Sequence, residues 1–411
     1  MKVCILTTSF PRSKEDSAGI FLYHLSRWLV KKGVNVEVIA PHDFRCHFTE
    51  NWENIQIHRF PYFFPFRLQR LCYGAGIVKN IKNDLLAILQ LPCLCVSEFF
   101  YSLVMIRKIK PDIIHAHWSL PQGLIGIVLK KVLHVPCVTS IHGTDMHGLR
   151  SRIFKALNRM VIWNSDACTA NSRATARLAR QVGANDNIEV VPMGVDTDCF
   201  SKARNSVSLK RRFEFEGPVI LFVGRLIDLK GIVYLINAMP AIVQRFPAAK
   251  AFIIGSGPMK DALVGLTENL ALQKNVVFIN QMAQEDLVPF YSMADIFVLP
   301  SIVNERGETE GLGVVLLEAM ACGLPVIGSN VGGIPDIISH GETGLLARQK
   351  DSQDLSNQIF KLITDEGLRK KVIRNARNLI ETQFSWAVVA EHFIHIYRHA
   401  LASMQPDAKR H

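Results

Sequence analysis

The segment DIFVLPSIVNERGETEGLGVVLLEAMACGLPVIGS, residues 295–329, contains a strand, a loop, a helix and a second strand in succession. Residues 295–301 and 324–329 are short apolar runs typical of buried strands, and residues 313–322 have the pattern of a helix. Such alternation gives a mostly parallel sheet that helices cover on both faces, with right-handed crossovers. The segment therefore predicts an α/β fold.

The same alternation recurs along the chain in two series. The first series predicts helices at 19–33 and 121–134. Its expected strands are VCILTT (3–8), VNVEVIA (34–40), IQIHRF (55–60), DIIHAHW (112–118), PCVTSIH (136–142), ACTAN (167–171) and IEVVPM (188–193). The second series adds, to the opening segment, strands at 219–224, 249–255 and 275–280 and helices at 231–246, 259–272 and 285–293. Two such series predict two facing Rossmann-like, doubly wound domains.

A polar stretch without strong periodicity, residues 196–218, separates the two series. We therefore expect a first domain at 1–205 and a second domain at 206–384. Open parallel sheets bind ligands at the carboxyl ends of their strands, so we expect a binding cleft between the two sheets. The polar motifs that follow predicted strands should cluster there.

The composition restricts the class of partner. The 411 residues carry a formal net charge of +11, which favours nucleic acid, an anionic membrane or a phosphorylated small substrate. Lys and Arg occur in short clusters without an interleaved aromatic stripe, so no nucleic-acid partner is expected. The nine cysteines lack zinc-type pairing, and no signal peptide is expected because the apolar stretch of MKVCILTTSFPRS is too short for one. No charge-free run reaches transmembrane length, and we expect a cytoplasmic protein.

Two carboxylates lie near the start of the helix in the opening segment. Glu310 ends an acidic loop, and Gly311, Leu312 and Gly313 follow it directly. Free backbone N–H groups at a helix N-terminus bind anions or sugar hydroxyls, and glycine allows the ligand to come close. Seven residues separate Glu310 from Glu318, which lies inside the helix. Both carboxylates have acceptor oxygens for paired sugar hydroxyls.

Each carboxylate also has a purely structural explanation. Glu310 at a helix N-terminus would stabilise the helix dipole by about 0.3–1 kcal/mol, which by itself accounts for a carboxylate there. Glu318 lies between VVLL and AMACG, where burial of an unpaired carboxylate is costly. The structural explanation is therefore stronger for Glu310 than for Glu318.

Two cations follow the strand expected at 219–224. Arg225 comes directly after the strand and Lys230 precedes the next helix, so both can point into one crevice. A guanidinium and an ammonium together suit a diphosphate whose charge grows as it leaves. Two solvated loop cations are the ordinary alternative explanation. The GSGPMK sequence at 255–260 adds little, because the full GxGxxG fingerprint is missing.

In the first domain, Gly19 and His142 follow predicted strands. Gly19 opens a helix and would allow a phosphate or an acceptor hydroxyl to come close. His142 lies at the carboxyl edge of a sheet, although a satisfied core or loop histidine is the simpler explanation. His115 and His117 share one strand face without a third ligand nearby, and Asp196 is expected to cap or turn the chain. No metal site is expected.

Together and in this order, the motifs resemble the retaining glycosyltransferases of family 4, which have the GT-B architecture. The resemblance spans nearly the whole chain, and its most specific part is EGLGVVLLEAMACGLPVIGSNVGGIPD at 310–336. The other matching motifs are SFPR…AGIF, PDIIHAHW, HGTD, VPMGVDTDCF, VGRLIDLKG, GSGP and ADIFVLPS.

The resemblance implies a role for each candidate residue of the second domain. Glu310 would hold the transferred sugar, and Glu318 would bind the ribose of the nucleotide. Arg225 and Lys230 match the residues that bind the donor diphosphate. The backbone of the GLG loop at 311–313 would meet the sugar and the phosphates.

The reaction that the resemblance implies is transfer of a glycosyl unit from a UDP- or GDP-sugar to a hydroxyl, with the anomeric configuration retained. His142 would lie close to the reacting centre of the sugar. The leaving phosphate would accept the acceptor's proton while protein cations offset its charge, so no cofactor and no tightly bound metal are expected. The chain departs from the usual pattern at Asn280 and Gln281, which replace a glycine, and at the charged NERGETE loop.

Two other classes of function remain as alternatives. A nucleotide-sugar epimerase of the same architecture would need acid–base carboxylates in the cleft and would release its product without an acceptor. A catalytically silent sugar-nucleotide-binding protein would keep the fold and lose transfer. The intact set of Glu310, Glu318, Arg225 and Lys230 argues against the silent protein.

Two further segments complete the expectations. The resemblance implies that residues 385–411 form a helix that packs back on the first domain. Residues 60–110 are aromatic, apolar and basic together. Either a helix pair here packs on the first sheet, or the surface meets a membrane and suits a lipid-linked acceptor. The expected partners are a nucleotide-sugar donor and a glycan or lipid-linked acceptor, with peripheral contact at the inner face of the membrane under the second explanation.

Overall fold

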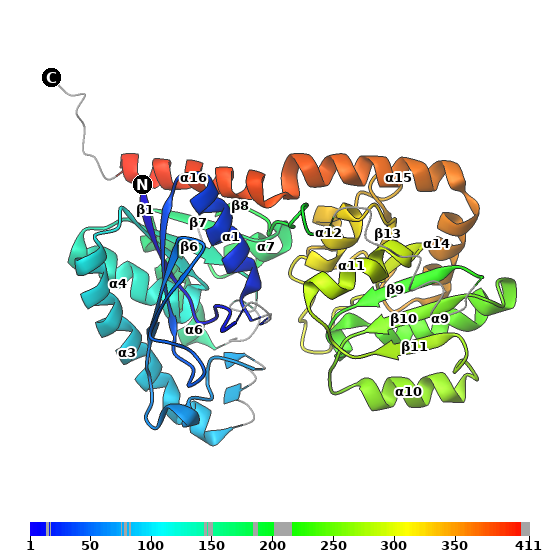
Figure 1. Cartoon of the computed structure of the whole chain (residues 1–411), viewed down its shortest axis with the longest axis horizontal. Helices are drawn as coiled ribbons and strands as arrows, with labels where there is room; N and C mark the ends of the chain where they lie inside the picture. Colours follow the sequence, from blue (N-terminus) through cyan, green and yellow to red (C-terminus); the bar gives the residue numbers. More distant parts are fainter. Residues whose placement is uncertain are drawn as a thin grey trace. The chain divides into compact units, whose positions relative to one another are not determined.

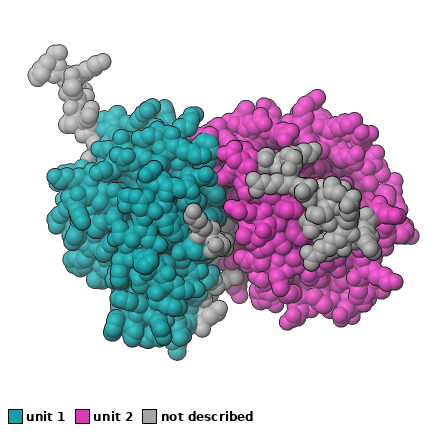
Figure 2. Space-filling model, in the orientation of Figure 1, with its two compact units in different colours: residues 1–192, 389–411 teal, residues 193–388 magenta. Residues whose placement is uncertain are grey.

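The fold of the chain is given by a computed structural model. The residues that it describes are 1–13, 16, 18–74, 76–77, 80–81, 84–143, 146, 151–183, 188–200 and 216–403. The chain divides into two compact units, residues 1–192 with 389–411 and residues 193–388 (Figure 2). The domain boundary expected between residues 205 and 206 lies outside the described residues.

The first unit is built on a single large sheet. Its strands are β1 (Lys2–Leu6), β2 (Asn35–Pro41), β3 (Thr49–Trp52), β4 (Ile55–Phe60), β5 (Ile113–His117), β6 (Cys137–Ile141), β7 (Ala167–Ala170) and β8 (Ile188–Val190). They form an eight-stranded sheet in the order β3-β4-β2-β1-β5-β6-β7-β8. Figure 1 labels β1, β6, β7 and β8 of this sheet. Strand β3 pairs antiparallel with β4, and the other described pairs are parallel.

Helices connect these strands and cover the sheet of the first unit. They are α1 (Ile20–Lys31), η1 (Phe66–Leu68), α3 (Leu85–Ile109), η2 (Ser119–Gly123), α4 (Leu124–Leu133), α6 (Arg152–Asn164) and α7 (Arg173–Gln181). Helix α16 (Trp386–Ser403) belongs to this unit from Val389 onward. Its buried Tyr397 hydroxyl lies 2.7 Å from Nδ1 of His115 in β5, and the rings of Phe393 and His115 are also in contact. The C-terminal helix therefore packs on the first unit through an apolar and hydrogen-bonded face.

The second unit contains a fully parallel sheet. Its strands are β9 (Val219–Val223), β10 (Lys250–Ile254), β11 (Val276–Ile279), β12 (Ile296–Leu299), β13 (Val326–Ser329) and β14 (Leu345–Ala347). They form a six-stranded sheet in the order β11-β10-β9-β12-β13-β14. Its helices are η3 (Asp228–Lys230), α9 (Ile232–Arg245), α10 (Lys260–Asn269), α11 (Gln284–Met293), α12 (Val314–Ala321), α13 (Ile334–Ile337), α14 (Ser352–Thr364), α15 (Glu366–Leu379) and η4 (Ile380–Phe384).

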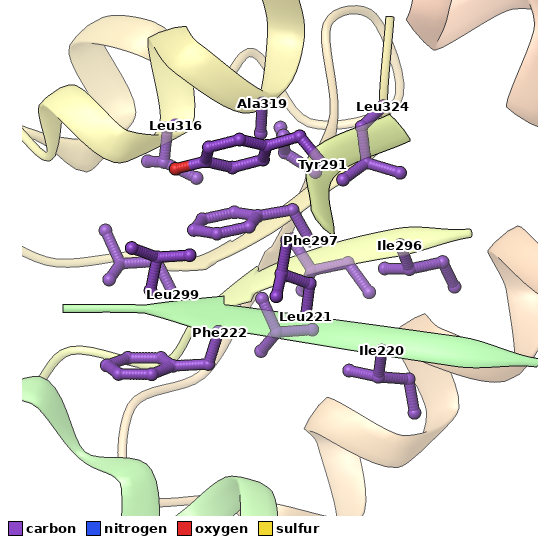
Figure 3. Packing of buried hydrophobic residues seen from close by; sticks show 14 of the residues in the cluster. Ile220, Leu221, Phe222, Tyr291, Ile296, Phe297, Leu299, Leu316, Ala319 and Leu324 are labelled. Atoms are coloured by element: carbon purple, nitrogen blue, oxygen red, sulfur yellow. The ribbon is translucent and has the colours of Figure 1, made fainter. Parts of the chain in front are cut away.

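The core of the second unit fixes the position of α11 and α12 over the sheet. Every residue of β12 is buried, as expected for a central parallel strand that helices cover on both faces. Figure 3 shows Tyr291 of α11 lying over Phe297 of β12, with Leu316 and Ala319 of α12 beside it. The ring centroids of Tyr291 and Phe297 are 5.6 Å apart. This packing holds the Tyr291 hydroxyl at a fixed place beside α12.

The expected strands and helices are present, and the two doubly wound α/β units confirm the predicted fold class. Two strands were missed because their signals are weak: β3 is short and largely polar, and β14 has only three residues. In the second unit, the chain leaves β9 toward β10 on one side and returns to β12 on the other side. Ligands of doubly wound sheets bind at such a switch point, outside the carboxyl ends of the strands.

Candidate functional site

The loops that follow β9 and β12 meet at the switch point of the second unit. Nζ of Lys230, at the end of η3, lies 2.5 Å from Oε2 of Glu310, which belongs to the loop after β12. Oγ of Ser301 donates to the same carboxylate oxygen at 3.1 Å. The sequence placed Lys230 and Glu310 at one edge of the sheet, and the structure brings them into an ion pair. Within the described part of the chain, Oε1 of Glu310 accepts no hydrogen bond.

Backbone contacts fix these two loops against each other. The N–H of Ile302 donates to the carbonyl of Leu229 at 2.9 Å, directly beside Lys230. Gly231 has a φ of 62°, and a Cβ there would lie 2.0 Å from the carbonyl oxygen of Pro300. Only glycine allows so close an approach in this conformation. Lys230 and Glu310 are therefore positioned by the backbone as well as by their own ion pair.

Two adjacent glycines after β13 contact the backbone at the end of the Glu310 loop. The N–H of Gly333 donates to the carbonyl of Glu310 at 3.0 Å, and a Cβ on Gly332 would lie 2.1 Å from the same oxygen. Sequence reasoning did not assign a role to Gly332, Gly333 or Ser301. The adjacent glycines of SNVGG were the signal for a close backbone contact.

The GLG loop presents backbone donors at the start of α12. Gly313 is the N-cap residue with a φ of 89°. For the described residues, no acceptor is found for the N–H groups of Gly311, Leu312 and Gly313. The Leu312 side chain is buried in the core, so this residue has only its backbone to offer a ligand. Free N–H groups at a helix N-terminus favour an anion or a hydroxyl, as expected from the sequence.

Arg225 belongs to the loop after β9, and the GSG sequence at 255–257 follows β10 directly. The Arg225 side chain is exposed and, among the described residues, forms no hydrogen bond or ion pair. A Cβ on Gly255 would lie 1.9 Å from the carbonyl oxygen of Gly224, and one on Gly257 would lie 2.3 Å from that of Leu226. The glycines of GSG therefore allow the β9 and β10 loops to pack backbone against backbone.

Glu318 is buried and bonded within the protein. Its Oε2 accepts from the Tyr291 hydroxyl and its Oε1 accepts from Nε2 of Gln284, both at 2.8 Å. The sequence indicated that a carboxylate here needs partners, and these two α11 side chains, which sequence reasoning missed, supply them. Burial raises the pKa of Glu318 from 4.5 to about 7, although the two hydrogen bonds partly oppose this shift. A contact of Glu318 with a ribose stays a prediction.

The raised pKa of Glu318 predicts a pH-dependent stability. Below pH 4.5 both the folded and the unfolded chain hold this proton, and between pH 4.5 and 7 only the folded chain does. Stability relative to a Glu318→Gln variant is therefore greatest at low pH and falls by about 3 kcal/mol between pH 4.5 and 7. Denaturant unfolding of both proteins at several pH values from 4.5 to 8 measures this difference. A difference that does not change with pH would contradict the prediction.

In the first unit, His142 follows β6 and lies in a cluster of aromatic rings. Its ring is 5.0 Å from that of Phe21 in the first turn of α1 and 5.1 Å from that of Trp118. Its Nε2 lies 3.0 Å from Nδ1 of His117. Burial lowers the pKa of His142 to about 3, so the imidazole is neutral near pH 7.

The structure connects the HAH motif to His142, which sequence reasoning did not foresee. Strands β5 and β6 are parallel neighbours with His117 opposite Ser140, two residues before His142. Both ring nitrogens of His115 are hydrogen-bonded. Nδ1 lies 2.7 Å from the Tyr397 hydroxyl, and Nε2 lies 2.8 Å from Oγ of Ser140. The available signal for this contact was a histidine at the carboxyl end of each of two consecutive predicted strands.

Gly19 and Asp196 each have a structural role in the first and second unit, respectively. Gly19 is the N-cap of α1 with a φ of 69°, and a Cβ there would lie 2.2 Å from the carbonyl oxygen of Ser9. The fold alone requires glycine here, and a ligand contact at Gly19 stays a prediction. Oδ1 of Asp196 accepts from the N–H groups of Asp198 and Cys199, so this residue turns the chain as expected. Over the described residues, no group of three or more His, Cys, Asp or Glu could hold a metal ion.

Two family models match the chain. The model described as Glycosyltransferase Family 4 matches residues 18–199, and the model described as Glycosyl transferases group 1 matches residues 208–379. The chain belongs to the glycosyltransferases that these two models describe. The membership of the family 4 and group 1 glycosyltransferases that the motifs indicated is thereby confirmed, and the protein is an enzyme of the sugar-transferring class.

Individual relatives agree with the family assignment. An uncharacterised glycosyltransferase of Methanocaldococcus jannaschii is 28% identical over 98% of this chain and 100% of its own length. A GDP-mannose-dependent alpha-(1-6)-phosphatidylinositol monomannoside mannosyltransferase of Mycolicibacterium smegmatis is 30% identical over 60% of this chain and 66% of its own. The structure of sucrose-phosphate synthase from Thermosynechococcus elongatus matches 98% of this chain and 99% of its own with a TM-score of 0.78 and 23% identity. This last likeness supports the GT-B fold.

Proposed function

We propose that this glycosyltransferase moves a sugar from a UDP- or GDP-sugar to a hydroxyl of a glycan or lipid-linked acceptor, with retention of the anomeric configuration. The observation that carries the proposal is the Lys230–Glu310 ion pair at the switch point of the second unit. One cation and one carboxylate on adjacent loops suit a donor with an anionic diphosphate and a hydroxyl-rich sugar. The GDP-mannose dependence of the mycobacterial relative supports a nucleotide-sugar donor.

In this proposal the donor diphosphate lies against Lys230, Arg225 and the N–H groups of the GLG loop. Lys230 and the backbone N–H groups are held in place before the reaction, and together with Arg225 they offset the charge that develops on the leaving diphosphate. The sugar lies against Glu310, whose Oε1 is unbonded among the described residues. No carboxylate is assigned as a covalent nucleophile, so the acceptor hydroxyl attacks the face from which the diphosphate leaves. As the bond to the acceptor oxygen forms and the bond to the diphosphate breaks, the leaving phosphate accepts the hydroxyl proton.

His142 acts as a neutral hydrogen-bonding group in the same proposal. Its lowered pKa excludes a charged imidazolium near pH 7, so it adds no positive charge of its own. A neutral imidazole can bond a sugar hydroxyl near the reacting centre. The ring cluster around Phe21 and Trp118 holds it in one orientation.

A thermal-shift screen of nucleotide-sugars tests the proposed function. A ligand that binds only the folded chain raises stability by about 2.7 kcal/mol at 100 times its dissociation constant. We expect a rise in Tm with one UDP- or GDP-sugar and none with the matching free sugar. A protein that no nucleotide-sugar stabilises would overturn the proposal, and free epimerised product without an acceptor would favour the epimerase alternative.

We also propose that transfer requires no tightly bound divalent metal. Lys230, Arg225 and the GLG amides supply the positive charge and dipoles that a metal supplies in other enzymes. Transfer in excess chelator is expected to proceed at the rate measured without chelator. If chelator abolishes transfer and magnesium or manganese restores it, a metal takes part and this electrostatic account is wrong.

A further inference from the structure

Helix α3 carries a continuous apolar ridge on its outer face. The exposed residues that form the ridge are Leu85, Ile88, Leu89, Val96, Phe100 and Val104. Leu89 is 68% exposed and Phe100 is 59% exposed, which is unusual for large apolar side chains of a soluble domain. Their spacing of three, four and seven residues places them along one side of the helix, over a length of about 28 Å. Only 22% of the most apolar part of α3 is buried.

The opposite face of α3 packs on the first unit. It contacts β4 and α4, and its buried residues include Gln90 and Glu98. Gln90 bonds the backbone at Arg70 and Leu68, and Nε2 of Gln122 donates to both oxygens of Glu98. In Figure 1, α3 lies beside α4 along the outside of its unit.

No charge-free run reaches transmembrane length, as expected, because Glu98 interrupts the apolar residues of α3. By length and composition alone, α3 is sufficient to span a bilayer. A spanning helix would have to leave β4 and α4 and carry Glu98 into hydrocarbon without its partner Gln122. A helix with one face packed on its own domain and the other face apolar is instead suited to lie in the plane of a membrane interface.

Basic residues border the ridge at both ends. Arg107 and Lys110 follow the last apolar turn, and both are exposed. Near the first turn, the exposed Arg70 forms an ion pair with the N-cap Asp84, with Nη1 and Oδ2 3.6 Å apart, and η1 exposes the unpaired Arg67 within the described part of the chain. The single carboxylate within α3 is the buried Glu98. The ridge and its borders therefore match the chemistry of an anionic lipid surface.

We propose that the α3 ridge docks in the plane of an anionic bilayer. The ridge enters the boundary between headgroups and acyl chains, and the basic residues contact lipid phosphates. Docking would hold the first unit beside a lipid-linked acceptor. In this respect alone, the inference rests on the proposed function. A second copy of the chain fits the ridge less well, because a two-fold pairing of α3 would bring the two basic borders together.

Vesicle binding of the purified full chain tests the proposal. The double variant Leu89→Ser with Phe100→Ser is expected to lower partitioning onto mixed phosphatidylcholine and phosphatidylglycerol vesicles by about 100-fold, roughly tenfold for each side chain. Both residues are exposed, so neither change opens the core. The matched control is Ile153→Ser with Met160→Ser on α6, whose side chains are 71% and 40% exposed. The control is expected to partition like the wild type.

Two further measurements separate the kinds of binding. Pure phosphatidylcholine vesicles, or the Arg107→Gln with Lys110→Gln variant on mixed vesicles, are expected to bind about tenfold more weakly. Alkaline carbonate is expected to release the wild type from vesicles. Release by detergent alone would mean that α3 spans the bilayer, and binding equal to wild type in the ridge variant would mean that the ridge does not dock. Either result overturns the proposal, as does a dimer in solution that the ridge variant abolishes.

The failure of this inference is distinguishable from a failure of the proposed function. Thermal stabilisation by the nucleotide-sugar is expected to be the same in the ridge variant and in the wild type, because α3 and the donor site belong to different units. A wild type that binds donor and ignores vesicles overturns only the docking surface. A wild type that binds vesicles and ignores every nucleotide-sugar overturns only the proposed function.

Discussion

Lys230→Ala is expected to lower kcat by about 100- to 1,000-fold while the chain keeps its fold. The ammonium is largely shielded from solvent and is held beside Glu310 by the Gly231 turn, so its charge acts at short range on a leaving diphosphate. Loss of one preorganised donor of this kind typically costs about 2.7–4 kcal/mol of transition-state stabilisation. Single-turnover kinetics with saturating donor measure the change.

A matched ion pair on the surface of the same unit provides the control. Lys370 and Glu366 form an exposed pair on α15, with Nζ and Oε1 2.7 Å apart. Lys370→Ala removes the same charge from the chain without touching the switch point, and kcat is expected to stay within twofold of wild type, since surface pairs contribute little. If Lys230→Ala behaves like Lys370→Ala, the Lys230–Glu310 pair is only structural.

Arg225→Ala should fall in the same range as Lys230→Ala, and it is the cleaner test of the two. The Arg225 side chain is exposed and has no partner among the described residues, so its loss cannot disturb a native contact there. An unchanged unfolding midpoint together with a large loss of kcat would show that the guanidinium acts on the ligand. A loss below tenfold would leave Arg225 as a solvated loop cation.

The fold of the second unit was predictable because its two central strands are short, uninterrupted apolar runs. Strands β9 and β12 carry this pattern, and buried parallel strands need it on both faces. Edge strands lack that requirement. Strand β3 reads TENW and β14 reads LLA, and neither pattern separates a strand from a loop.

The candidate site was predictable where a residue belongs to the loop that follows a strand. Arg225 and Glu310 belong to loops whose position the parallel order determines, so the sequence could place them at one edge. The partners of Glu318 could not be found in this way. Tyr291 and Gln284 come from α11, and which faces of α11 and α12 meet depends on the packing in Figure 3 rather than on spacing in the chain. The same reason hid the contact of His117 with His142.

Glu310→Gln is expected to lower turnover far more than it lowers nucleotide affinity. The carboxylate is expected to meet the sugar, where positive charge develops only in the transition state, so kcat falls while the dissociation constant of UDP or GDP stays within a few fold. The substitution keeps the size of the side chain and an acceptor oxygen for Lys230 and Ser301. Glu366→Gln on α15 is the matched control.

Glu318→Ala is expected to show the opposite behaviour, mainly weakening nucleotide binding. The substitution also has a second effect, on stability. The Tyr291 hydroxyl and Nε2 of Gln284 lose their acceptor, so the free energy of unfolding falls by about 1–3 kcal/mol. Nucleotide affinity measured at a temperature well below the Tm of the variant separates the two effects, because the variant is then fully folded. If Glu318→Ala loses stability but binds UDP or GDP like the wild type, Glu318 supports α11 and no ribose contact exists. If Glu310→Gln is then equally mild in turnover, Glu310 only stabilises the start of α12.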